Sequence, residues 1–291
     1  WYLDHLTDQF AESAWGIFQE IERQGGLLEA LESGFIAEQI EAAYAPRAKD
    51  ISRRKEGITG VSEFPNIDEE LPRRTPLEPQ ALRNQARTRL DARKHVPKIP
   101  PSLDSFAELV DAAKLGASIG ELAASTGFHQ ETTTVVPLPA RCFAEPFEDL
   151  RNASDQWQQA HGQRPRVFLA NMGPVSHHSG RATYSKNFFE AGGFEVVGND
   201  GFADAASAVT AFQKCGATIA VISSSDKLYP EIVPEVAKEL KTAGARSVVL
   251  AGHPGENEAA WRDAGVDRFI FMKCDVLGTL TEMLREEGVI Q

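Results

Sequence analysis

Residues 218–251, TIAVISSSDKLYPEIVPEVAKELKTAGARSVVLA, contain two short apolar runs on either side of a longer stretch with helical spacing. Short apolar runs that alternate with helical stretches are typical of parallel strands joined by crossover helices. The same pattern repeats on both sides of this unit. It predicts strands at 167–170, 194–197, 218–222, 248–251 and 269–271, and helices at 181–191, 204–214, 229–243, 256–264 and 276–287.

These five units predict an α/β domain over residues 164–291 with a doubly wound, five-stranded parallel sheet. Because parallel strands need right-handed crossovers, the simplest strand order is the flavodoxin-like 2-1-3-4-5. Ligands of such sheets bind outside the carboxyl ends of the strands, where the strand order reverses. We therefore expect any ligand near residues 171–180 and 223–228, with Gly252 and His253 beside them.

The first 61 residues have a helical pattern. Apolar residues from Leu6 to Ile21 follow a 3.6-residue period, a second helical stretch covers residues 35–55, and residues 57–61 look like a short strand. These faces need a sheet that this sequence does not contain, so we expect residues 1–61 to be the carboxy-terminal end of a TIM barrel. The chain opens at Trp1 with no initiator methionine and no signal-peptide pattern, so we expect it to lie inside a longer protein.

Residues 62–163 predict an extended linker with short helices, because prolines recur from Pro65 to Pro139. Residues 45–98 contain 13 Lys and Arg against 8 Asp and Glu. Basic side chains at helical spacing, such as Arg83 and Arg87, usually form a solvated surface. They would also suit a connector that wraps an acidic partner.

The overall composition excludes several classes of function. Among 291 residues, 42 acids outnumber 30 bases, and the net charge is −12, which argues against nucleic acid or an anionic membrane as partner. No apolar run approaches the roughly 20 residues of a membrane-spanning helix. Cys142, Cys215 and Cys274 form no C-x-x-C pair, which predicts neither a disulfide framework nor a zinc site and favours the cytoplasm.

The segment after the first expected strand reads NMGPVSHHSG, residues 171–180. Its adjacent residues His177 and His178 suggest a metal, but the sequence supplies no convergent second pair of ligands, so we expect no metal site. The segment also lacks the glycine spacing of a phosphate-binding loop. A phospho-acceptor domain would carry acids where Asn171 stands.

From Arg164 to Gln291 the chain resembles the carboxy-terminal cobalamin-binding domain of methylmalonyl-CoA mutase. The resemblance is carried by Arg-Pro-Arg at 164–166, Met-Gly at 172–173 and Val-Pro-Glu at 233–235. It continues upstream through residues 107–122 and covers essentially the whole chain.

Members of this family that bind cobalamin carry Asp-x-His-x-x-Gly, Ser-x-Leu and Gly-Gly at the three loops. Here Val175 takes the place of the Asp that orients the cobalt-binding His, a loss that typically lowers metal affinity about 10–100-fold. Ser-x-Leu becomes Ser-Ser-Ser, and Gly-Gly becomes Gly-His, which places a ring where the nucleotide tail would lie. The resemblance therefore implies a vestigial pocket at His177, Gly180, Ser223, Ser225, Gly252 and His253, with no bound cofactor.

The resemblance further implies the small (beta, non-cobalamin-binding) subunit of the heterodimeric members of the family, with no catalytic residue of its own. Its partner would be a homologous catalytic large subunit that holds adenosylcobalamin and interconverts methylmalonyl-CoA and succinyl-CoA. Two alternatives stay open. One is an active cobalamin-binding mutase or carrier that uses His177 or His178 as cobalt ligand. We expect His178 to be the more exposed of the two, with Ser176 or Ser179 hydrogen-bonded to a nitrogen of its ring. The other is a flavodoxin-like signalling or binding module.

Overall fold

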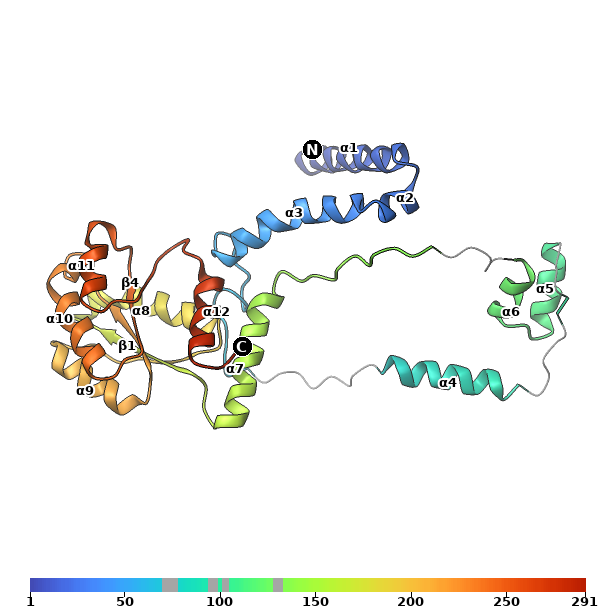
Figure 1. Cartoon of the computed structure of the whole chain (residues 1–291). Coiled ribbons are helices and arrows are strands. Elements are labelled where there is room, and N and C mark those ends of the chain that lie inside the picture. The colour runs from blue at the N-terminus through green and yellow to red at the C-terminus, as the bar shows by residue number, and fades with distance from the viewer. Residues whose placement is uncertain (70–77, 94–98, 101–104, 128–132) are drawn as a thin grey trace. The chain divides into compact units, whose positions relative to one another are not determined.

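The computed structural model describes residues 1–69, 78–93, 99–100, 105–127 and 133–291 (Figure 1). Parts of the predicted linker therefore lie outside the described residues. The chain divides into two compact units, one with residues 1–36 and 70–138 and the other with residues 37–69 and 139–291. The second unit contains the sheet.

The sheet has five parallel strands in the order β2-β1-β3-β4-β5, so the predicted fold and strand order are confirmed. The strands are β1 (Arg166–Asn171), β2 (Glu195–Val197), β3 (Ile219–Ser223), β4 (Ser247–Ala251) and β5 (Arg268–Ile270). Every residue of β3 and β4 is buried, as expected for central strands covered on both faces. The register places Asn171 opposite Ser223 at the carboxyl edge.

Helices cover both faces of this sheet (Figure 1). Val167 and Leu169 of β1 belong to one core cluster and Phe168 and Ala170 to the other, because successive strand side chains point to opposite faces. The first cluster includes residues of α7 (Glu145–His161), α8 (Val175–Glu190) and α12 (Val276–Glu286). The second includes residues of α9 (Ala205–Cys215), α10 (Tyr229–Thr242) and α11 (Glu258–Asp263), which follows the short 3-10 turn Gly255–Asn257.

The helix that the sequence predicts from residue 181 begins six residues earlier, at Val175. Pro174 is the residue before the helix and has an extended backbone with ψ 151°, and the His177 amide donates to its carbonyl at 2.8 Å. Proline suits a helix start, because its missing N–H has no partner there in any case. His177, His178 and Gly180 therefore lie on the first turns of α8 rather than in a loop.

The sheet-containing unit also includes segments upstream of residue 164. Phe147 and Leu150 of α7 are buried in the first core cluster, together with Ile51 near the end of α3 (Phe35–Ser52). The strand-like piece 57–61 forms only an isolated bridge between Thr59 and Glu63. The expected strand is wrong because Gly60 adopts φ 79° and turns the chain back on itself.

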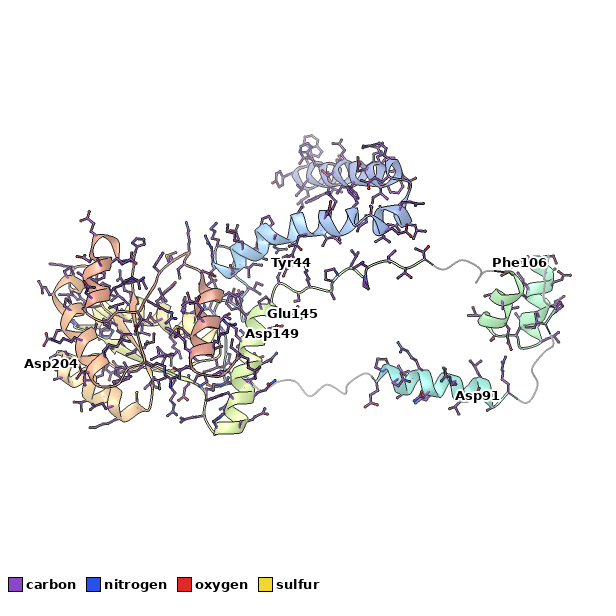
Figure 2. The ribbon with its side chains drawn as sticks, viewed as in Figure 1. Tyr44, Asp91, Phe106, Glu145, Asp149 and Asp204 are labelled. Carbon is purple, nitrogen blue, oxygen red and sulfur yellow. The ribbon has the colours of Figure 1, made fainter. Side chains whose placement is uncertain are left out.

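The other unit is helical in its described part. It contains α1 (Tyr2–Arg23), α2 (Leu27–Glu32), α4 (Pro79–Asp91), α5 (Phe106–Lys114) and α6 (Ile119–Ser125). Every residue of α1 is exposed or half-buried, so its apolar stripe faces solvent. Phe106 at the start of α5 is 81% exposed (Figure 2). Within the residues that the structure describes, no helix combines the length and apolar character needed to cross a membrane.

Candidate functional site

The candidate site lies at the carboxyl edge of the sheet, where α8 follows β1, residues 223–228 follow β3 and Gly252 follows β4. Two of the sequence-predicted residues are in contact, because His177 Nδ1 lies 2.8 Å from Ser225 Oγ. Val175, at the position of the orienting carboxylate, is 60% exposed. A serine hydroxyl from the β3 loop is therefore the group that holds the His177 ring.

His178 is buried rather than available at the surface, with 4% of its area exposed. Its two ring nitrogens have no hydrogen-bond partner within the described residues, so the predicted bonds from Ser176 or Ser179 are not formed. The ring packs closely against Gly201, where an added Cβ would lie 2.6 Å from His178 Nε2. Its position is that of a core side chain.

Arg181 fills the space beside Gly252. Its Nη1 donates to the Ala251 carbonyl at 2.9 Å, and its Nη2 donates to Asp226 Oδ1 at 2.8 Å. An added Cβ on Gly252 would lie 2.5 Å from Arg181 Nη1. The Arg181 guanidinium group therefore occupies the space that the missing side chain of Gly252 leaves at this edge. The sequence gives no sign of the role of Arg181, because its contact with Ala251 lies 70 residues away along the chain.

Tyr229, at the start of α10, completes this arrangement. The Arg181 guanidinium carbon lies 4.8 Å from the Tyr229 ring centroid. The fully buried Tyr229 hydroxyl donates to the Ala251 carbonyl at 2.6 Å and accepts from the Ser224 amide at 3.1 Å. Burial raises the pKa of this phenol, so it stays protonated as a donor at neutral pH.

The remaining predicted residues are dispersed around the edge. The exposed His253 packs its ring edge-on against Phe271 with centroids 4.7 Å apart, and its Nδ1 accepts from the Gly255 amide. Ser223 is fully buried, and its hydroxyl has no hydrogen-bond partner among the described residues. Gly180, Gly252 and His253 line a cavity of about 440 Å³ beside Arg181. The group packed against Gly252 is thus Arg181, not the imidazole that the sequence suggested.

These residues do not fit cobalamin. The position of the orienting carboxylate is an exposed valine, the His177 ring is bonded to Ser225, and Arg181 occupies the space beside Gly252. A cobalt-binding imidazole normally depends on a carboxylate or carbonyl that fixes its tautomer. Within the described part of the chain, no group of three His, Cys, Asp or Glu residues is arranged to hold a metal ion.

Comparison with known proteins shows which family this chain is related to. A family model described as Methylmalonyl-CoA mutase matches residues 1–130. The chain is 37% identical over 289 residues to the methylmalonyl-CoA mutase small subunit of Streptomyces virginiae, which covers 99% of this chain. The chain belongs to the methylmalonyl-CoA mutase family. The small subunit of Propionibacterium freudenreichii subsp. shermanii is 30% identical over 291 residues, again covering 99% of this chain.

The predicted resemblance to small subunits of this family is therefore confirmed. The chain spans about 37% of the length of each of these two relatives. A cobalamin-binding protein of Desulfitobacterium hafniense DCB-2, known from a crystal structure, matches with 19% identity and a TM-score of 0.36. That match covers 73% of this chain and 93% of that protein. This similarity is too low to support a conclusion.

Proposed function

We propose that this chain is part of the small subunit of a heterodimeric methylmalonyl-CoA mutase, an isomerase of the cytoplasm that interconverts methylmalonyl-CoA and succinyl-CoA. In this proposal the chain supplies no catalytic residue. It stabilises a homologous large subunit, which binds adenosylcobalamin and substrate. The observation that carries the proposal is the packing of Arg181 against Gly252, at the edge where cobalamin-binding members of the family keep a second glycine.

A cofactor that entered this edge would have to displace several interactions together. Arg181 would lose its bonds to Ala251 and Asp226, and the Tyr229 ring would lose its cationic neighbour. His177 would also have to leave Ser225 and bind cobalt without a carboxylate behind it. The missing carboxylate alone corresponds to about a 10–100-fold loss of affinity. These costs favour a silent subunit over an active carrier that uses His177 or His178.

The domain organisation is part of the proposal. Residues 1–61 would be the end of a TIM barrel, 62–163 a linker and 164–291 a degenerate cobalamin-binding-like domain. The exposed apolar side chains of α1 support this division, among them Phe10, Trp15, Ile17 and Phe18. An apolar surface of this kind marks an interaction site in a folded protein. We propose that the upstream part of the same subunit covers it.

The experiment is to purify the full small subunit together with its large subunit and count cobalamin. The proposal expects one cobalamin per heterodimer, unchanged by His177→Ala or His178→Ala in the small subunit. A second cobalamin per heterodimer, lost in the His177→Ala variant, would favour the active-carrier alternative. A small subunit that never co-purifies with a mutase large subunit would favour the flavodoxin-like binding module.

A further inference from the structure

A second cavity, of about 680 Å³, lies on the α8 side of the sheet, within the sheet-containing unit. Four cationic side chains line it, and one acidic side chain accompanies them: Arg53, Arg54, Lys55, Lys273 and Glu63. They come from the segment that follows α3 and from the turn that precedes α12. Such a local excess of positive charge is unexpected in a chain whose net charge is −12.

The backbone around this cavity is strained. Among the described residues, the non-glycine residues with positive φ are Arg54 at 53°, Phe64 at 50° and Lys273 at 70°. All three line the cavity. Non-glycine residues rarely adopt this conformation, and such strain tends to cluster at ligand-binding sites. At each position glycine would fit the backbone better, yet each position carries a large side chain.

Asn187 of α8 holds two of these strained positions in place. Its carbonyl accepts from Arg54 Nη2 at 2.7 Å, and its side-chain oxygen accepts from the Phe64 amide at 3.3 Å. The Arg54 guanidinium also lies over the Phe188 ring, 5.6 Å from its centroid. The Arg54 Nε, however, is buried and has no partner within the described residues. A buried cationic donor without an acceptor is costly. Because this atom has almost no accessible surface, a ligand in the cavity would be held by the rest of the guanidinium group and not by Nε.

The other cations of the cavity divide into paired and free ones. Lys55 forms an ion pair with Asp50 at 2.9 Å. Neither Arg53 nor Lys273 has an ion-pair or hydrogen-bond partner in the part of the chain that the structure describes. Glu63 offsets one positive charge. The side chains that line the cavity therefore carry a net positive charge, with free cations from both chain segments.

Apolar and aromatic side chains form the remaining wall, including Phe64, Tyr184 and Val276. We propose that this cavity binds an organic phosphate with a flat apolar body, whose phosphate oxygens contact Arg53, Arg54 and Lys273. Arg and Lys donors suit the several acceptor oxygens of a phosphate group, and the aromatic rings suit a planar body. This cavity adjoins the 440 Å³ cavity at the edge of the sheet, with which it shares Gly180, Tyr184 and Met272, but His177 does not line it. The proposal does not rest on the proposed function.

The test uses the full chain at low salt and adenosine 5′-monophosphate as the probe, followed by isothermal titration calorimetry. The proposal expects saturable binding that inorganic phosphate displaces and that adenosine does not reproduce. Lys273→Gln and Arg53→Gln should each weaken binding about tenfold or more, the value of one charge-assisted hydrogen bond. Lys214→Gln removes the same charge from an exposed position of α9 that does not line the cavity, and it should leave binding unchanged.

A further variant separates ligand binding from folding. Lys273→Gly relieves the positive φ of 70° while it removes the ammonium group. The proposal expects weaker binding of the probe with an unchanged or higher Tm. A lower Tm together with unchanged binding would assign Lys273 a structural role and overturn the proposal. Absence of binding to the unmodified chain, or equal losses in the Lys273→Gln and Lys214→Gln variants, would also overturn it.

Discussion

Replacing Tyr229 with Phe tests the hydrogen-bond network that closes the edge of the sheet. The change removes one oxygen atom and leaves the ring against Arg181 and Trp261. The Ala251 carbonyl keeps Arg181 as a donor at 2.9 Å. The Ser224 amide donates to the Tyr229 hydroxyl at 3.1 Å, and Ser224 is fully buried. In the variant this amide loses its acceptor. The substitution therefore mainly leaves one buried donor unsatisfied.

An unsatisfied buried donor costs about 1–3 kcal/mol in the free energy of unfolding. For a domain of 150–250 residues, 1 kcal/mol corresponds to a Tm change of about 2–4 °C. We therefore expect Tyr229→Phe to lower the Tm of the sheet-containing unit by about 2–12 °C. The secondary structure should not change, because the ring keeps its packing.

Urea and thermal unfolding followed by circular dichroism measure this change. Tyr2→Phe is the matched control, because Tyr2 is 78% exposed and the same atom is removed from solvent. The control should change the free energy of unfolding by no more than about 0.5 kcal/mol. Equal stabilities of the Tyr229→Phe variant and the control would refute the role given to the buried hydroxyl.

Three further predictions concern a helix cap, a titrating carboxyl group and the thiols. Asp204, labelled in Figure 2, caps α9, because its side chain accepts a hydrogen bond from the Ser207 amide at 2.8 Å. Asp204→Ala should therefore lower the free energy of unfolding by about 0.5–2 kcal/mol. An unchanged midpoint in urea unfolding would contradict this. Hydrogen bonds from Arg93 and from the cap of α6 lower the pKa of Glu121 to about 2 from 4.5. Its contribution to helix stability is therefore present above pH 4.5 and is lost as the pH falls toward 2, and NMR titration of the Glu121 carboxyl checks this. The exposed Cys142 should react with a thiol reagent before Cys274, whose pKa is raised by burial, and equal rates in peptide mapping would refute the assigned burial.

The sheet could be predicted from sequence because its signal is local. Each strand is a short apolar run and each crossover is a helical stretch, so the order of five parallel strands follows from general rules of connection. The start of α8 could not be placed in this way. The residues from Val175 to Gly180 occupy the positions of a loop motif of the family, whereas in this chain a helix begins at Val175 after the extended Pro174.

The candidate site was harder to predict because its contacts are distant in sequence. The bond from Arg181 to Ala251 spans 70 residues, and the bond from His177 to Ser225 spans 48. Neither pair has a spacing that a motif would reveal. His253 packs against Phe271, in the segment after β5. The loss of the family motif could be read from the sequence, but the group that packs at the altered edge could not.

The cavity at Arg54 illustrates a second limit. Positive φ is normally anticipated from glycine, and here the strained positions carry arginine, phenylalanine and lysine. Two of these positions, Arg54 and Phe64, are bonded to Asn187, which lies more than 120 residues away along the chain. A sequence pattern therefore gives no sign that these side chains share one cavity.

The most direct test of the central claim is cobalamin retention by the chain itself. The purified chain is incubated with excess adenosylcobalamin, passed through a desalting column and measured by visible absorbance. The account predicts that the protein fraction carries no corrin absorbance, because Arg181 and the Ser225-bound His177 leave no usable site. Retention of one cobalamin per chain with a shifted spectrum, abolished by His177→Ala, would contradict it.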